Sequence, residues 1–225
     1  PVSVREGYKG TIVQLGTDSR RTSSDTPFGL ANKYAAALNL YSAQELGSGS
    51  KNIVKAAWPY DASWQYKDAN DLPVRVYMAN TDRTNNTDGC IAESDYTLVY
   101  DGTVNIAKQT AAELAITLSK PFTYKKGKNL AVLTVINAEK YSYVMFKAYV
   151  SKDQSNAAYE WYAYQTTGWF DSPQSVHFAS LREKSSVTFF MTDPQDSGIS
   201  DTTVDNLTST TPQVYHLARR TLAAG

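Results

Sequence analysis

Apolar and polar residues alternate with a period of two in several segments of this chain, as expected for β-strands that bury one face. From Val74 to Ala79, Val, Val and Met point one way and Arg, Tyr and Ala the other, which predicts a half-buried strand. The segment from Leu114 to Ser119 alternates in the same way. Thr110 and Glu113 form a weak capping box that competes for a helix there, but we favour the strand.

Other strands are predicted from apolar, aromatic and β-branched runs between turn-forming residues. Leu130 to Ile136 is a nearly continuous apolar run, and Tyr141 to Val150 follows after Asn137 to Lys140, a segment suited to a hairpin turn. We predict that both are central core strands. The remaining predicted strands are Thr11 to Leu15, Asn52 to Trp58, Tyr96 to Val104 with a turn at Asp101-Gly102, Tyr159 to Tyr164, and Val187 to Met191.

Helical patterns are limited to Asn32 to Leu38 and a short segment from Leu217 to Ala224. Strands therefore do not alternate with helices, as a parallel α/β sheet would require. We predict an all-β fold of about ten antiparallel strands arranged as a β-sandwich. A jelly roll would protect the sheet edges at this size.

The composition changes after residue 192, where Asp, Ser, Thr, Gly and Gln replace most apolar residues. Such a segment contributes little to a core, so residues 193–212 are predicted as a polar linker or long surface loop. Residues 1–192 are predicted as one β-sandwich module. Residues 213–225 are predicted as a terminal strand or helix leading toward another domain.

Composition and charge narrow the classes of partner. The 225 residues, 42% of them hydrophobic, suffice for a sizeable core. The 22 basic and 22 acidic residues balance, without a dense Lys/Arg run, so we predict no nucleic-acid partner. No apolar stretch approaches the ~18 residues of a membrane span. The single cysteine, Cys90, excludes an intramolecular disulfide and a zinc pair and is predicted as a packing residue.

Four short phrases occur in order along the chain: Tyr-Ser-Ala-Gln-Glu-Leu at 41–46, Val-Arg-Val-Tyr-Met-Ala-Asn-Thr at 74–81, Val-Tyr-Asp-Gly-Thr-Val at 99–104, and Pro-Phe-Thr-Tyr at 121–124 followed by Asn129-Leu130. In order and spacing they resemble the jelly-roll modules of secreted, Bacteroidetes-type surface proteins described as cell-adhesion proteins. The resemblance extends from Thr11 to Met191. One departure is the basic turn 125–128, Lys-Lys-Gly-Lys, where the family usually carries an acidic residue and a glycine.

The resemblance implies an exported, non-catalytic module of a larger parent protein, secreted or anchored at the outer membrane. Its matched residues look structural, so the resemblance supplies no site residue. The implied role is cell adhesion, with a glycan or a host or neighbouring-cell surface protein as partner. Two alternatives stay open: a carbohydrate-binding module of a polysaccharide-utilisation system, and a structural spacer.

Two aromatic clusters are the candidate ligand sites, because aromatic rings stack on sugars while nearby polar groups orient the hydroxyls. In the first cluster, Trp64 and Tyr66 stand beside Asp61 as a candidate sugar platform. The alternative, which we favour, is that Trp58 and Tyr60 end a core strand and the other aromatics cap the sandwich.

The second cluster spans residues 159–170 and includes Trp161 and Trp169. Alternation places its aromatics on both faces of a strand, so one face is exposed unless both are covered. Trp169 follows Gly168, as at a loop tip. Trp161 and Trp169 complete the candidate sugar platforms, although core packing or loop anchoring is favoured slightly for this cluster.

Catalytic and metal sites find little support in the sequence. No nucleophile elbow, zinc-protease helix or phosphate loop is present, and Glu160 and Asp171 are the best carboxylates for a glycosidase. We therefore predict that the chain is not an enzyme. No cofactor is predicted, with calcium left open because of four aspartates whose spacing matches no defined calcium loop: Asp193, Asp196, Asp201 and Asp205.

Overall fold

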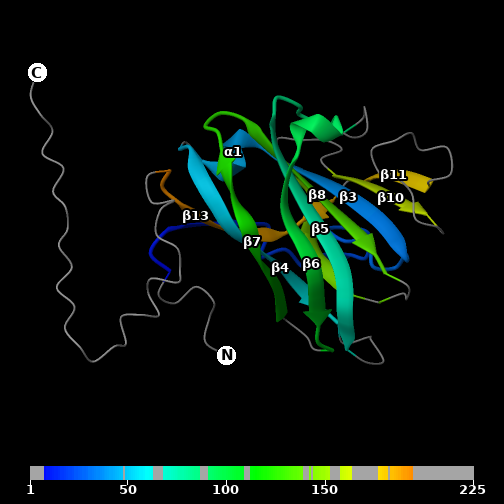
Figure 1. The fold of residues 1–225 in the computed structure, drawn as a ribbon. Helices are drawn as coiled ribbons and strands as arrows, with labels where there is room; N and C mark the ends of the chain where they lie inside the picture. Colours follow the sequence, from blue (N-terminus) through cyan, green and yellow to red (C-terminus); the bar gives the residue numbers. More distant parts are fainter. Residues whose placement is uncertain are drawn as a thin grey trace, which may run out of the picture.

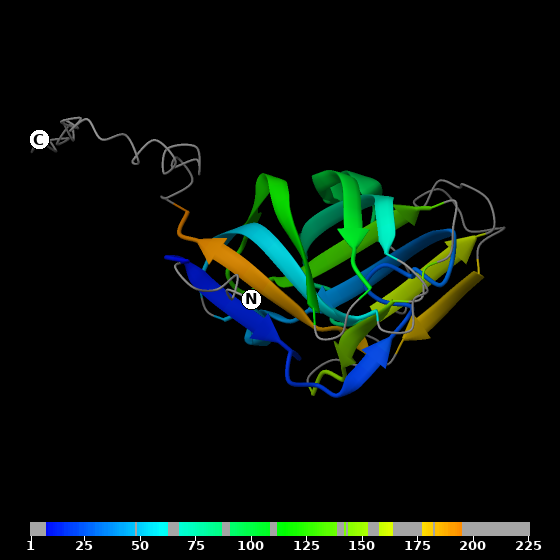
Figure 2. The ribbon, with the colours of Figure 1, turned by 90° about the horizontal axis from the view of Figure 1, so that it is seen from below.

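The fold comes from a computed structural model, which describes residues 8–47, 49–62, 68–86, 91–108, 112–138, 142, 144–152, 158–163, 177–181 and 183–194. Thirteen strands and two short helices occur within these residues. Every strand pair is antiparallel. The two sheets form an all-β sandwich (Figures 1 and 2), which confirms the predicted fold class.

The first sheet has seven strands. Its main path is β1 (Thr11–Leu15), β13 (Val187–Thr192), β4 (Lys51–Asp61), β9 (Met145–Tyr149) and β12 (Lys184–Ser185). Two further strands branch from this path: β2 (Arg21–Ser23) pairs with β9, and β7 (Ala112–Tyr124) pairs with β4.

The second sheet has six strands, in the order β11 (His177–Leu181), β10 (Ala158–Ala163), β3 (Tyr34–Tyr41), β8 (Asn129–Asn137), β5 (Ala69–Thr81) and β6 (Thr97–Ile106). The helices are the single turn α1 (Ala43–Leu46) and the 3-10 turn η1 (Glu93–Asp95). Figure 1 shows β10 and β11 at one end of the sandwich and β13 at the other. Within the described ranges, no helix has the length and apolarity needed to cross a membrane.

Period-two alternation explains which faces are buried. In β5, Val74, Val76 and Met78 face the core between the sheets, as predicted. Tyr77 and Ala79 point to the outer face of the sheet but are buried in a second apolar cluster there. This strand is therefore buried on both faces along this stretch, where the sequence predicted burial on one.

The core between the sheets is dominated by aromatic rings. Trp58 is fully buried and packs edge-on against Phe28, with ring centroids 5.2 Å apart. Tyr41 packs in the same way against Phe189, at 5.4 Å. Such pairs are worth about 0.5–1.5 kcal/mol beyond the area that they bury. Trp58 and Tyr60 thus pack in the core, in agreement with the favoured reading of the first aromatic cluster.

The predicted helix at 32–38 is wrong, because the chain forms β3 there instead. This strand lies between β8 and β10. Its alternate side chains enter two apolar clusters, Ala35 in the core between the sheets and Ala36 and Leu38 on the outer face. A strand that is apolar on both faces has no period-two signal, so its pattern cannot be told from that of a buried helix.

Two predicted turns are also wrong. Asp101 and Gly102 lie within β6, opposite Arg75 and Val74 of β5. The Tyr100 hydroxyl donates to the Thr103 carbonyl at 2.8 Å, so its ring lies over the glycine. The expected hairpin at 137–140 does not form either, since β8 belongs to the six-stranded sheet and β9 to the other. The chain therefore passes from one sheet to the other between β8 and β9.

The first and last strands of the sandwich are neighbours. β1 pairs with β13, and Thr11 lies opposite Met191. After β1 the chain turns at Gly16, whose φ of 64° and closeness to the Tyr149 ring leave no room for a side chain. The predicted domain boundaries stay predictions, because residues 195–225, with the expected segment at 217–224, lie outside the described residues.

Candidate functional site

The residues predicted as sugar platforms are only partly within the described structure. Asp61 is the last residue of β4, half-buried, with Met145 of β9 as its Cα partner. Trp161 lies in β10, of which the backbone is described at this position, opposite Ala36 of β3. Trp64, Tyr66 and Trp169 lie outside the described residues. Their role as sugar platforms therefore stays a prediction.

The predicted calcium segment is described only at its start. Asp193 pairs with Lys51, with 2.5 Å between the carboxylate oxygen and Nζ. The other three aspartates lie outside the described residues, as does Cys90. In the part of the chain that is described, no three His, Cys, Asp or Glu residues gather as metal ligands would.

The phrases that carry the family resemblance make hydrogen bonds that hold turns in place. Ser42 and Glu45 form a reciprocal capping box around α1. Asn129 links this turn to its neighbours: its Oδ1 accepts from the Ala43 N–H at 2.8 Å, and its Nδ2 donates to the Arg83 carbonyl at 2.6 Å. The Tyr124 hydroxyl donates to the Lys128 carbonyl at 2.8 Å, which closes the basic turn.

A buried ion pair joins α1 to β12. The Lys184 side chain has no exposed surface, and its Nζ donates to Glu45 Oε2 at 2.6 Å and to the Leu40 carbonyl at 3.0 Å. The ammonium also lies 5.3 Å and 5.2 Å from the ring centroids of Tyr41 and Tyr149. Burying a charge without a partner is costly. These contacts offset that cost and so allow the ammonium of Lys184 to be buried.

Further polar groups extend from this ion pair into the core. The Tyr41 hydroxyl bonds with the Ser185 hydroxyl at 2.7 Å, and the Ser185 N–H donates to Asn39 Oδ1 at 2.8 Å. Burial is the main cause that raises the pKa of Tyr41 above its ordinary value. We call these five residues the buried polar network: Asn39, Tyr41, Glu45, Lys184 and Ser185.

One cleft borders the buried polar network, but the carboxylate beside it, that of Glu45, already bonds within the protein. It has a volume of about 340 Å³ and lies beside Glu45, Tyr149 and Ser151. Glu45 Oε1 accepts from the Tyr149 hydroxyl at 2.8 Å, while Oε2 accepts from the Ser42 N–H and from Lys184. Both oxygens therefore serve the fold, and this cleft is the weaker candidate for a ligand.

A second cleft opens where two edge strands depart from regular pairing. In the ladder of β4 and β7, Ile53 lies opposite Phe122 and Lys55 lies opposite Thr117, so residues 118–121 of β7 bulge out of the ladder. Pro121 lies within this bulge, and proline has no N–H to donate to a ladder. β-bulges bend a strand and often occur beside binding and active sites.

The facing strand, β6, carries an irregularity of its own. Tyr100 pairs with Val76 and Leu98 pairs with Tyr77, so Val99 is the extra residue of a bulge. The Ser119 hydroxyl donates to the Val99 carbonyl at 2.9 Å, which ties the two bulges together. The space beside this link is open, and we call it the β6–β7 cleft.

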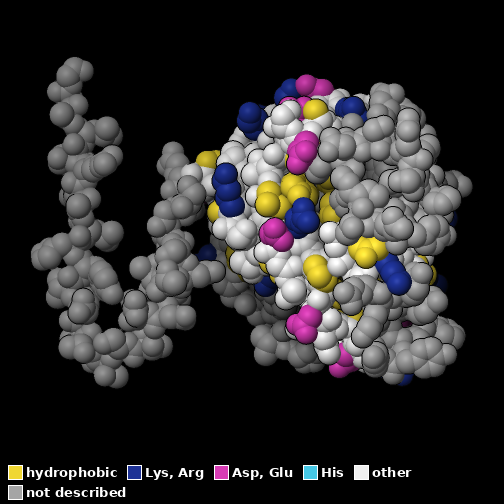
Figure 3. Space-filling view, turned by 45° about the vertical axis from the view of Figure 1, so that its right-hand side comes forward, with side chains coloured by type: hydrophobic (Ala, Val, Ile, Leu, Met, Phe, Trp, Pro, Cys, Tyr) yellow, Lys and Arg dark blue, Asp and Glu magenta, His cyan; other side chains and the backbone are white. Residues whose placement is uncertain are grey.

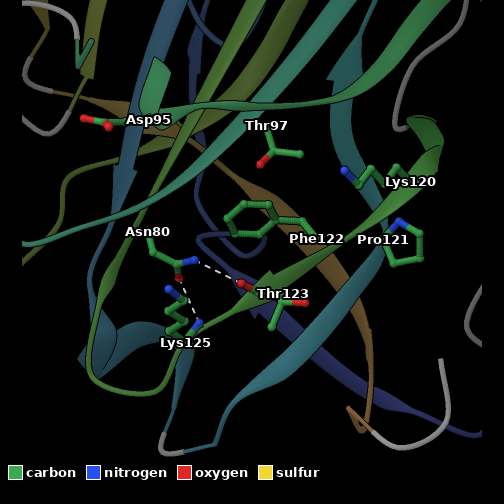
Figure 4. A pocket seen from close by; sticks show the side chains of 8 residues that line it. All are labelled: Asn80, Asp95, Thr97, Lys120, Pro121, Phe122, Thr123 and Lys125. Atoms are coloured by element: carbon green, nitrogen blue, oxygen red, sulfur yellow. Dashed lines mark hydrogen bonds between the residues drawn. The ribbon is translucent and has the colours of Figure 1, made fainter. Parts of the chain in front are cut away.

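The β6–β7 cleft has a volume of about 350 Å³ and is shown in Figure 4. Its wall at the end of β5 is Asn80, whose Nδ2 donates to the Thr123 carbonyl at 3.0 Å and whose Oδ1 accepts from the Lys125 N–H at 2.8 Å. Asn80 therefore joins one sheet to the end of the other. The cleft is lined by Asn80, Asp95, Thr97, Lys120, Pro121, Phe122, Thr123 and Lys125.

Several polar groups of this cleft are not used by the fold. Asp95 and Lys120 project from opposite sides (Figure 4). Within the described residues, the side chains of both residues, like those of Thr97 and Lys125, make no hydrogen bond or ion pair. Unlike Glu45, these groups are available to a ligand in water. This availability makes the β6–β7 cleft the better candidate site.

One face of the molecule carries charges of both signs. Figure 3 shows one face on which basic and acidic side chains are interspersed around a small apolar group, without a broad field of either sign. This distribution agrees with the zero formal net charge. The charge in the β6–β7 cleft is therefore local, and it suits a small charged group better than a long charged polymer.

Sequence reasoning did not find the β6–β7 cleft. Its residues come from β5, η1, β6, β7 and the basic turn, which the topology alone brings together. Two signals were present, however. Pro121 within a strand pattern indicates a bulge or an edge, and the basic turn departs from the family pattern.

Comparisons with known proteins found only distant structural similarity. No protein-family model matches the chain, and no curated protein matches it. A structure of the clostridial cysteine protease Cwp84 after propeptide cleavage is 14% identical over 80% of this chain and 40% of that chain, with a TM-score of 0.39. The cysteine protease and lectin-like domains of Cwp84, a surface layer associated protein of Clostridium difficile, are 12% identical over 70% and 32%, with a TM-score of 0.37.

These comparisons correct one prediction. The sequence predicted that the chain is not an enzyme, whereas both similar structures are of a cysteine protease. That prediction is contradicted and withdrawn. The present chain spans 40% or less of those chains' length, and at such TM-scores the likeness does not transfer the protease activity.

Proposed function

We propose that this chain is a ligand-binding module of an exported cell-surface protein and that the β6–β7 cleft is where it attaches to a surface glycan. The observation that carries the proposal is a preformed cleft in which the side chains of Asp95, Thr97, Lys120 and Lys125 make no hydrogen bond or ion pair among the described residues. The family resemblance supports export, display at the cell surface and a role in adhesion.

The chemistry of the cleft suits a sugar. Sugar rings present hydroxyls that exchange hydrogen bonds with groups such as Asp95 and Thr97, and C–H faces that pack on apolar rings. Pro121 is exposed at the cleft and Phe122 is nearly buried beneath it. A shallow, largely polar site of this kind holds a sugar at a surface without enclosing it.

The cleft is also held in shape before any ligand arrives. Asn80 fixes Thr123 and Lys125, and the Ser119 hydroxyl fixes the two bulges at 2.9 Å. Because little ordering is needed on binding, the entropy cost of association is small. This preorganisation supports a binding role for the cleft.

The test is to apply the purified 225-residue chain to immobilised glycans and to cell-surface and matrix proteins, beside a variant with an obstructed cleft. Thr97→Trp places a large ring in the cleft. The matched control is Thr103→Trp, an exposed position on the same strand that does not line the cleft. Circular dichroism and thermal unfolding establish that both variants fold.

Glycan binding that Thr97→Trp abolishes and Thr103→Trp leaves unchanged is the expected result. Glycan binding that survives Thr97→Trp would move the site elsewhere, with the aromatic clusters next in line. Binding to a protein in place of every glycan, or binding to nothing, would overturn the glycan proposal. The last of these results would favour the spacer alternative.

A further inference from the structure

We infer that the sugar bound in the β6–β7 cleft carries a carboxylate, so that the ligand is an acidic sugar of the uronate or sialate type. The inference rests on the proposed function and names the ligand class of the same cleft. Its basis is that two lysines without a partner among the described residues line this one cleft.

Two lysines at this end of the sandwich are paired with aspartates. Lys128 contacts Asp82 with 2.6 Å between Nζ and a carboxylate oxygen, and Lys51 contacts Asp193 at 2.5 Å. Lys120 and Lys125 both line the cleft, and among the described residues neither ammonium has a hydrogen-bonding or ionic partner. Two unpaired cations facing one small space attract an anion.

The single acid of the cleft limits how much negative charge the ligand carries. Asp95 is exposed and lines the cleft on the side away from Lys120. Two ammonium groups and one carboxylate leave one net positive charge. That balance suits a sugar with one carboxylate better than a group with two negative charges. Asp95 and the Thr97 hydroxyl remain to bond the sugar hydroxyls.

The position of Lys125 is fixed by the fold. Its N–H donates to Asn80 Oδ1 at 2.8 Å, and its carbonyl accepts from the Lys128 N–H at 3.1 Å. The neighbouring Lys126 N–H donates to the Ser50 hydroxyl at 3.0 Å. The basic turn is thus anchored at each end, which holds the stem of Lys125 at the rim of the cleft.

The test uses pairs of probes that differ in charge alone: oligogalacturonate with its methyl ester, and sialyllactose with lactose. Binding to the full chain is measured by glycan array and then by isothermal titration at low and high salt. Lys120→Gln and Lys125→Gln remove one charge each. Lys126→Gln is the matched control, because it removes the same charge from the same turn but does not line the cleft.

We expect binding to the acidic member of at least one pair and not to its neutral partner. Each cleft substitution should weaken binding about five-fold and the double variant about twenty-five-fold, while Lys126→Gln changes it less than two-fold. Binding should also weaken as salt screens the charges. Asp95→Asn should strengthen it a few-fold, because the only acid of the cleft is neutralised.

Three results overturn the inference, and they can be told apart. Equal binding of acidic and neutral partners that Thr97→Trp abolishes removes the carboxylate requirement and leaves the proposed function intact. Acidic binding that Lys126→Gln weakens as much as the cleft variants shows general attraction by charge and no site. Failure to bind any glycan overturns the inference together with the proposed glycan function.

Discussion

The buried polar network contains Glu45 of α1 and the β6–β7 cleft contains Lys125 of the basic turn, and the two regions use charged side chains differently. In the network, Lys184 and Glu45 satisfy each other and the hydroxyls around them. In the cleft, Lys120 and Asp95 lie on opposite sides and form no ion pair with each other. Charge that a fold needs for stability is buried and paired, whereas charge kept for a partner stays in water and unpaired. Substitutions in the two regions should therefore affect different measurements.

The largest effect is expected from Lys184→Met. Removing one member of a buried ion pair leaves Glu45 with an uncompensated charge, at a cost of about 3–5 kcal/mol in the free energy of unfolding. Urea denaturation followed by fluorescence measures this change. Lys51→Met is the control: its ion pair with Asp193 is partly exposed, so it should cost no more than about 1 kcal/mol. Similar losses in both variants would contradict the comparison.

A second variant sharpens the same result. Glu45→Gln combined with Lys184→Met removes both charges, and glutamine keeps the capping box of α1. The double variant should be more stable than Lys184→Met alone, since no unpaired buried charge remains. Strictly additive losses would mean that the two side chains stabilise the fold independently.

A smaller effect is expected from Asn80→Ala, which removes two hydrogen bonds at the wall of the cleft. The free energy of unfolding should fall by about 1–2 kcal/mol, and ligand affinity should fall as well because Lys125 loses its anchor. Thermal unfolding and titration measure the two changes. Asn70→Ala, at an exposed position on the same strand, is the matched control and should alter neither.

Alkaline pH probes the network through Tyr41. Burial raises the pKa of this hydroxyl above its ordinary value of 10.0, so it stays protonated in the folded chain when the unfolded chain releases the proton. The stability that this provides is complete below a pH of about 10 and is lost as the pH rises further, by at most about 1.4 kcal/mol per pH unit. Urea denaturation along a pH series should show a weaker alkaline loss in Tyr41→Phe than in the unmodified chain.

The smallest effect on stability is expected in the cleft itself. Lys120→Gln and Lys125→Gln should change the free energy of unfolding by less than about 0.5 kcal/mol, because neither ammonium has a protein partner. The same denaturation experiment measures this. A loss above about 1 kcal/mol in either variant would show that these lysines stabilise the fold. The difference between the buried polar network and the cleft would then be smaller than the geometry indicates.

Strands with one buried face were predictable, and strands with two were not. The alternation of β7 places Leu114, Ile116 and Leu118 inside, and the structure agrees. β3 is apolar on both faces, so the segment 32–38, most of which lies in this strand, gave the pattern of a helix. The turn expected at Asp101 and Gly102 failed for a different reason, because pairing with β5 outweighs the turn preference of these two residues.

Sites whose residues are distant in sequence could not be predicted from the pattern of apolar and polar residues. Asp95 and Lys120 are 25 positions apart and line one cleft only because β6 and β7 face each other across their bulges. Lys184 looks like an ordinary surface lysine in the sequence, and its burial depends on Glu45, which is 139 positions away. The aromatic clusters were visible because their members are neighbours in sequence, and the role of Trp64 and Trp169 stays a prediction.

The pairing of β1 with β13 has a mechanical consequence. Thr11 and Met191 are opposite each other, so the chain enters and leaves the sandwich at the same point. Tension applied to the chain on both sides would pull these two strands apart from that point, and their hydrogen bonds would open one after another instead of together. Under load the module should yield at this pair first and at low force, while β5, β6 and β8 belong to the other sheet and pair with neither strand.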